Sequence, residues 1–148
     1  MNRCISKGED DYYTDILKVV NAIGGRSLNY NWLITEIETS TGDYFYEEYV
    51  IVSNDELLDN LENKEIQWIW GTFFAIPKKY KQEEILKYNL PGVENIDKKE
   101  IKIQHPLAEI EIIAYDSTFV QLIAKDKTIA EKFKKLYKKA YTTLKKEV

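Results

Sequence analysis

The feature that most constrains the fold is a change of hydrophobic period within residues 109–146. In Glu109–Tyr115 apolar side chains alternate with Glu109 and Glu111, which is typical of a strand with one face in solvent. A short turn at Asp116-Ser117 leads into Thr118–Ala124, which is rich in apolar, β-compatible residues. The segment therefore begins as a β-hairpin.

The period then becomes helical. From about Lys127 to Lys145, apolar residues recur at three- and four-residue steps, and most lysines lie off that stripe. The stripe consists of Ile129, Phe133, Leu136, Ala140 and Leu144. Such a helix must bury its apolar side, and the hairpin before it supplies a sheet to pack against.

The rest of the chain adds more strands than helices. Further strands are predicted at Asn2–Ser6, Tyr30–Thr39, Tyr44–Val52, Ile66–Ile76 and Glu100–Gln104. Helices are predicted from an Asp10 or Asp11 cap to Ile23 before Gly24-Gly25, from a Ser53–Glu56 capping box through Leu61, and briefly at Tyr80–Tyr88. We expect one α+β domain over residues 1–148, with a largely antiparallel sheet of about five to seven strands, helices packed on it and a long C-terminal helix.

Ile66–Ile76 is the most apolar of these strands. Strict alternation would place Trp68, Trp70 and Phe74 on one face, and Ile69, Phe73 and Ala75 on the other. Both faces then look covered, which predicts a central position in the sheet.

Composition excludes several classes of protein. Charged residues at 31% and hydrophobic residues at 44% describe a globular chain. The single cysteine, Cys4, excludes an internal disulfide and is expected as an apolar filler of the first strand. No apolar run follows the early charges, and Ile66–Pro77 is too short for a membrane helix. A cytoplasmic protein without a membrane partner is predicted.

The net charge of −4 conceals a segregation. Residues 125–148 hold nine lysines and three carboxylates, whereas Glu36–Glu65 holds ten carboxylates and one lysine. Either the two segments neutralise each other within one molecule, or one of them meets a charged partner.

The search for catalytic motifs is negative. The sequence has no glycine-rich phosphate loop, H-E-x-x-H motif or nucleophile elbow, and its single histidine excludes a multi-histidine metal site. His105, beside Pro106, is expected to be an exposed or half-buried loop side chain. We therefore favour a non-enzymatic role with no catalytic residue, metal or cofactor.

The hairpin Tyr30–Val52 is the more informative candidate site. Depending on the length of its loop, Glu36 falls opposite Glu47 or Glu48, and either register sets like charges across the strands. Tyrosines supply contact area at interfaces, and carboxylates steer a basic partner. The predicted partner-binding residues are Glu36, Glu38, Asp43, Tyr44, Tyr46, Glu47, Glu48 and Tyr49.

Three alternatives remain open. Lysines of the C-terminal helix, or Lys78, Lys79 and Lys81, could neutralise the hairpin within the monomer. A small-ligand or enzymatic pocket could lie near Trp68, Trp70 and His105. The Lys-rich helix could bind nucleic acid, although a pI near 5.2 disfavours this.

Five short stretches resemble a small uncharacterised bacterial family, a domain of unknown function. They are Arg3–Ser6, Asp15–Lys18, Tyr30–Ile34, Tyr115–Val120 and Ala124–Lys127. The resemblance implies a compact α+β domain and contributes no catalytic residue. In its general character the chain is also similar to immunity proteins that neutralise bacterial toxins. Our leading functional hypothesis is a non-catalytic binding protein that uses the acidic, Tyr-bearing hairpin against a basic protein surface, and a toxin-neutralising inhibitor is a narrower form of it.

Overall fold

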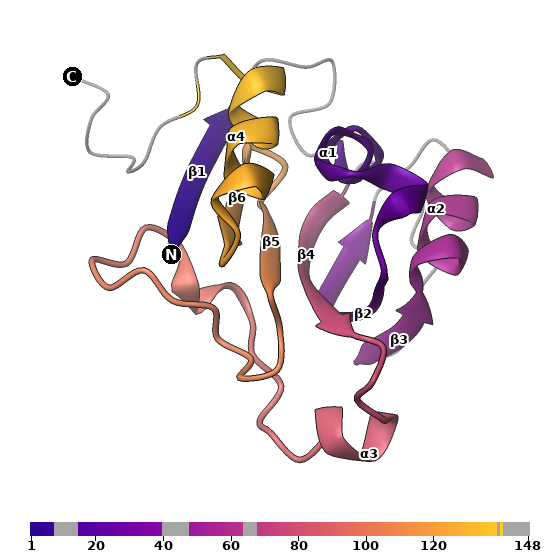
Figure 1. Ribbon diagram of the computed structural model, residues 1–148. Helices are drawn as coiled ribbons and strands as arrows, with labels where there is room; N and C mark the ends of the chain where they lie inside the picture. The colour runs from indigo at the N-terminus through magenta and orange to yellow at the C-terminus, as the bar shows by residue number, and fades with distance from the viewer. Residues whose placement is uncertain (8–14, 40–47, 64–67, 139, 141–148) are drawn as a thin grey trace.

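A computed structural model describes residues 1–7, 15–39, 48–63, 68–138 and 140. Its core is one antiparallel sheet of six strands in the order β1-β6-β5-β4-β2-β3 (Figure 1). The strands are β1 (Asn2–Lys7), β2 (Tyr30–Thr39), β3 (Tyr49–Ser53), β4 (Trp68–Pro77), β5 (Ile110–Tyr115) and β6 (Phe119–Ala124). The predicted α+β class is confirmed, and the apolar strand β4 is central, between β5 and β2.

Three helices cover one face of this sheet (Figure 1). They are α1 (Ile16–Ile23), α2 (Asn54–Asn63) and α4 (Lys127–Leu136). Helix α4 packs on β1, β6 and α1, whereas α2 packs on β2, β3 and α1. Helices α2 and α4 thus lie toward opposite edges of the same face, with α1 between them.

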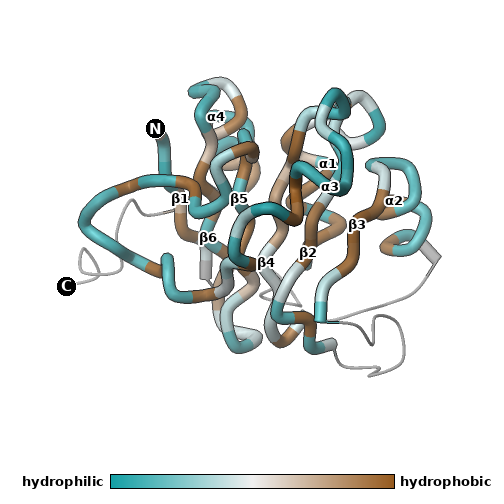
Figure 2. Tube along the Cα trace, turned by 90° about the horizontal axis from the view of Figure 1, so that it is seen from below, coloured by the Kyte–Doolittle hydropathy of each residue, from teal (hydrophilic) through white to brown (hydrophobic). Residues whose placement is uncertain are grey.

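The second face is covered by the long connection from β4 to β5. It contains α3 (Gln82–Ile85) and the short 3-10 turn η2 (Val93–Asn95). A second 3-10 turn, η1 (Gly25–Ser27), follows α1. Ile85 and Ile103 of the connection pack with Leu33 and Phe74 of the sheet. Figure 2 shows apolar residues concentrated along the strands and hydrophilic residues along the outer loops.

Helices α1 and α4 differ from their predicted bounds. Helix α1 begins at Ile16, because the Asp15 carboxylate caps it by accepting from Lys18 N at 3.2 Å. The predicted caps Asp10 and Asp11 lie outside the described residues. Gly24 ends the helix at φ 151°, as predicted.

Helix α4 is shorter than the predicted 127–145. Tyr137 leaves the helical conformation and turns its ring into the core, where it lies 4.8 Å from the ring of Phe133. Ile129, Ala130 and Phe133 form the buried side, so the predicted stripe is correct over the helix that the structure describes.

The prediction for the faces of β4 is wrong at Trp68. The pairing of β2 with β4 shifts on both sides of Glu38, so the alternation of side chains is interrupted between Trp68 and Trp70. Trp68 joins the core under the helices and packs against Phe73. Trp70 lies against Tyr115, with ring centroids 4.8 Å apart.

Two further differences concern the second face. Glu100–Gln104, predicted as an edge strand, is irregular and lies in the covering connection. Glu111, expected in solvent, is 0% exposed beneath that connection. Cys4 fills the core as predicted, and burial raises the pKa of its thiol.

Candidate functional site

The predicted acidic hairpin is described only in part. Glu38, Glu48 and Tyr49 are placed, whereas Asp43, Tyr44, Tyr46 and Glu47 lie outside the described residues. Strand pairing places Thr35 opposite Tyr49, which is the register that would continue to Glu36 opposite Glu48. The β2–β3 pairing ends at Thr35 and Tyr49, before that pair. Glu36 and Glu48 are therefore not a cross-strand pair, and the expected repulsion between them does not arise there.

Glu36 has a structural contact that the sequence did not reveal. It adopts φ 49°, which marks an irregularity in β2, and its Oε2 accepts a hydrogen bond from Val93 N at 3.0 Å. A Cβ on Gly92 would clash with the Glu36 carboxylate, so any other residue at position 92 would force this carboxylate to move. Glu36 thus fastens the β4–β5 connection to β2, and its replacement would disturb that contact as well as a surface charge.

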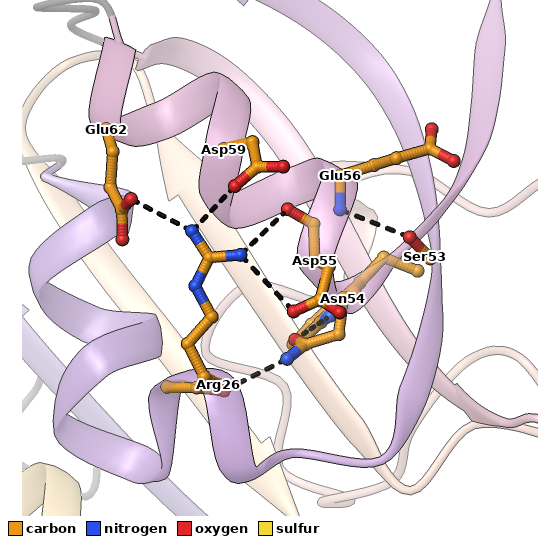
Figure 3. Close-up of polar contacts among 9 residues, drawn as sticks. Arg26, Ser53, Asn54, Asp55, Glu56, Asp59 and Glu62 are labelled. Atoms are coloured by element: carbon orange, nitrogen blue, oxygen red, sulfur yellow. Dashed lines mark hydrogen bonds and ion pairs between the residues drawn. The ribbon is translucent and has the colours of Figure 1, made fainter.

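A second group of carboxylates lies on α2, beside this hairpin (Figure 3). Arg26 of η1 reaches Asp55 at 3.2 Å, Asp59 at 2.7 Å and Glu62 at 2.9 Å. The hydrogen bonds that Arg26 donates to these carboxylates, the bond to Asp59 first, raise the pKa of its guanidinium. One guanidinium is therefore shared by three carboxylates, so this group keeps an excess of negative charge.

Glu56 belongs to the same helix but points away from Arg26 (Figure 3). Its backbone N–H donates to Ser53 Oγ at 3.1 Å, which confirms the predicted N-terminal cap. Asn54, which is buried, ties this helix start to the sheet: its side chain accepts from Trp32 Nε1 at 2.9 Å and donates to Gly25 O at 3.0 Å.

We call this surface the acidic end. It comprises Glu38, Glu48, Asp55, Glu56, Asp59 and Glu62. In the part of the chain that the structure describes, Glu38, Glu48 and Glu56 have no cationic partner.

The described lysines that could neutralise the acidic end lie elsewhere. Helix α4 is at the β1–β6 side, several strand spacings of about 4.8 Å from β2 and β3. Lys78 and Lys79 follow Pro77, which pairs with Tyr30 at the opposite end of β2 from Glu38. Over roughly 20 Å such attractions are largely screened at physiological salt. The lysines of α4, Lys78 and Lys79 therefore leave Glu38 and Glu48 unneutralised, whereas Asp55 and Glu56 begin α2 at the same end of the sheet as Pro77.

Trp68, Trp70 and His105 do not converge on one pocket. Trp68 belongs to the core under the helices, whereas His105 lies on the other face, near Phe74. His105 is buried, so the expectation of an exposed or half-buried ring is wrong. Its Nδ1 accepts from Leu107 N at 3.1 Å and its Nε2 donates to Ile85 O at 2.9 Å, so the neutral ring links α3 to the chain before β5. Burial lowers its pKa.

A polar layer lies on the second face, where sequence reasoning predicted no site. Glu111 of β5 accepts hydrogen bonds from Asn95 Nδ2 at 2.7 Å, Gln104 Nε2 at 3.1 Å and Gln104 N at 3.1 Å. Next to it, Gln121 of β6 donates to Asn95 O and accepts from Asp97 N. These sheet residues replace apolar packing with a set of hydrogen bonds to residues 95–104.

Arg3 of β1 extends this layer to the edge of the sheet. Its guanidinium donates to Lys98 O and lies 3.5 Å from Asp97 Oδ1. Arg3, Glu111 and Gln121 are all nearly or fully buried. The only signal in the sequence was the occurrence of polar residues within apolar strands, which alternation alone assigns to solvent.

Above this layer the chain forms an open hollow of about 320 Å³. Its lining, which we call the amide hollow, is supplied by residues 94–104: Glu94, Asn95, Lys98, Lys99, Glu100, Lys102 and Gln104. Two amide side chains that bind Glu111 therefore also face this space.

Within the described ranges, no group of three His, Cys, Asp or Glu side chains is arranged to hold a metal ion. The helices in those ranges are too short or too polar to cross a membrane. No protein-family model, curated protein or solved structure matches the chain.

Proposed function

We propose that the protein is a non-catalytic binding module that engages a basic protein partner through the acidic end. The observation that carries this proposal is the segregation of charge: Glu38, Glu48 and Glu56 form no ion pair among the described residues, and the Lys-rich helix α4 lies at the β1–β6 side of the sheet, opposite β3. A surface of one sign raises the rate of association with a partner of the other sign and disfavours partners of the same sign.

The edge of β3 supplies a contact surface within the acidic end. In the described part of the chain β3 pairs only with β2, so its outer backbone N–H and C=O groups have no strand partner. Glu48 precedes this strand and Glu56 follows it. An extended basic segment could pair with the free edge and meet a carboxylate near each end.

A toxin-neutralising role is a narrower form of this proposal. It rests on the acidic character of the chain and its resemblance to immunity proteins, and a basic toxin would be a partner of the required charge. Membership of the uncharacterised bacterial family likewise remains a prediction from short sequence stretches.

The test is a pull-down from the source cell's lysate at low salt with immobilised wild type and a Glu38→Lys/Glu48→Lys variant. Glu36 is left intact because its carboxylate fastens the connection at Val93. We expect wild type to retain a basic protein and the variant to bind it about tenfold more weakly or worse, since like charges at an interface cost affinity.

A matched control carries the same change of charge elsewhere, as Glu83→Lys/Glu131→Lys on exposed positions of α3 and α4. It should retain the partner as wild type does, and thermal unfolding should show that all three proteins are folded. Capture of the same basic proteins by wild type and by the Glu38→Lys/Glu48→Lys variant would refute the proposal.

A further inference from the structure

We propose that the amide hollow binds a small organic anion that also carries an amine or amide N–H group. This site lies over β5, β6 and β1, away from the acidic end, and does not depend on the function proposed there. The inference rests on three features of the hollow: the direction of its amides, its free lysines and the anchoring of its backbone.

The floor of the hollow presents hydrogen-bond acceptors. Glu111 accepts from the NH₂ groups of both Asn95 and Gln104, and those groups also donate to Lys102 O and Gly92 O. The donors are thereby directed into the protein. Among the described residues nothing donates to Asn95 Oδ1 or Gln104 Oε1, and neither oxygen is a buried unsatisfied atom. The fold thus fixes two amide oxygens as acceptors for an N–H donor.

The rim of the hollow presents positive charge. Lys98, Lys99 and Lys102 are exposed, and none forms an ion pair with another described residue. Glu94 and Glu100 also line the space, so the excess is a single positive charge. A carboxylate, or a phosphate monoester with its charge of about −1.5 to −2 at pH 7, can accept hydrogen bonds from the ammonium groups of this rim.

The backbone of the hollow is held in place before any ligand arrives. Side chains of three adjacent strands hold it by hydrogen bonds. Arg3 of β1 donates to Lys98 O, and Gln121 of β6 donates to Asn95 O and accepts from Asp97 N. Glu111 of β5 accepts from Gln104 N. A preorganised site loses less conformational entropy on binding than a loop that must be ordered.

The size of the hollow limits the ligand to a small molecule. Its volume of about 320 Å³ lies at the low end of the range for small-molecule pockets, which is roughly 300–1,000 Å³. Two probes distinguish a ligand whose anionic group is a phosphate from one whose anionic group is a carboxylate. Adenosine 5′-monophosphate joins a phosphate to an exocyclic amine, and L-glutamine joins a carboxylate to amine and amide groups.

The test is a titration of the isotope-labelled full chain with each probe at millimolar concentration, followed by amide chemical shifts in two-dimensional NMR. We expect saturable shifts centred on residues 94–104 with at least one probe, and the responding probe identifies the anion. Adenosine keeps the amine without the phosphate, and ribose 5-phosphate keeps the phosphate without the amine. If the ligand's anionic group is a phosphate, both should bind more weakly than the nucleotide. Absence of saturable shifts with both probes would overturn the proposal.

Two triple variants test the role of the rim. Lys98→Gln/Lys99→Gln/Lys102→Gln leaves the polar layer intact and should weaken binding about tenfold or more, because it removes every cation of the rim. Lys132→Gln/Lys134→Gln/Lys135→Gln removes the same charge from exposed positions of α4 and should bind as wild type does. Equal affinity of the two variants would show that the probe binds elsewhere, which would also overturn the proposal.

Discussion

Glu111 is a carboxylate that the fold removes from water and surrounds with neutral donors. Desolvation disfavours its charged form and raises its pKa above the ordinary value of about 4.5, whereas the bonds from Asn95 and Gln104 act in the opposite direction. Burial is the larger effect. Ionising a buried acid that has no cation nearby costs free energy. The same carboxylate of Glu111 fixes the orientation of the Asn95 and Gln104 amides in the hollow.

The raised pKa predicts how stability depends on pH. Between the unfolded and the folded pKa, the folded protein binds more protons, so the contribution of Glu111 is fully present below about pH 4.5 and is lost as pH rises through the folded pKa. The free energy of unfolding of wild type, minus that of Glu111→Gln, should therefore decrease as pH rises from about 4 to 7.

Urea unfolding of both proteins across that range measures this difference, and groups common to both largely cancel. Glu109→Gln, at the start of the same segment, provides a control with the same loss of charge. A difference for Glu111→Gln that increases with pH would show that the three hydrogen bonds outweigh desolvation.

At the scale of elements, local pattern predicted the strands well. Strand β2 was predicted with its observed bounds, and β5, β6 and their turn at Asp116-Ser117 lie within one residue of their predicted positions, although both faces of β5 are buried. These elements are encoded by their own side chains: a period of two, β-compatible residues and turn residues between them.

The errors arose where the structure depends on distant residues. The irregular pairing of β2 with β4 moves Trp68 to the opposite face, which no alternation in β4 reveals. Glu111 was assigned to solvent because a polar residue in a strand does not indicate that a distant segment will cover it. The acidic segment was found from charge alone, but the contact of Glu36 with Val93 and the amide hollow depend on a long connection whose path is tertiary.

The β5–β6 turn itself contains a correctable strain. Asp116 and Ser117 both have positive φ, at 46° and 58°, as in a type I′ turn, and the bond from Thr118 N to Tyr115 O at 2.8 Å closes it. Asp tolerates this conformation better than Ser does, and glycine adopts it without steric cost. We predict that Ser117→Gly raises the free energy of unfolding by about 0.5–1 kcal/mol.

Chemical denaturation of wild type, Ser117→Gly and Ser117→Ala separates the cause. Ala removes the hydroxyl but keeps Cβ, so it should not gain stability, and the backbone bond from Ser117 N to Ile69 O is available to all three proteins. Equal stability of the Gly and Ala variants would mean that the left-handed conformation carries no cost at this turn.

At the scale of the whole molecule, one sheet separates the two proposed sites. The acidic end lies along β2, β3 and α2, whereas the amide hollow lies over β5, β6 and β1 on the other face. Charge changes on α2, across the sheet from the hollow, should therefore leave binding at the hollow unchanged, because sites that share no partners usually behave additively.

The strand order also predicts an uneven distribution of local stability. Strands β4 and β5 are bonded on both sides and largely buried, whereas β3 is bonded on one side and only half-buried along its length. Amides such as those of Phe73 and Ile112 should exchange only on global unfolding, and those of β3 by local opening that is faster by more than about tenfold. Hydrogen–deuterium exchange followed by NMR measures both classes, with edge strand β1, which also carries buried residues, as the comparison. If a partner strand pairs with the free edge of β3, hydrogen exchange of the β3 amides should become slower on complex formation, whereas exchange of the β1 amides should not change. Protection of β3 equal to that of β5 in the free protein would contradict an open edge and weaken the proposed docking there.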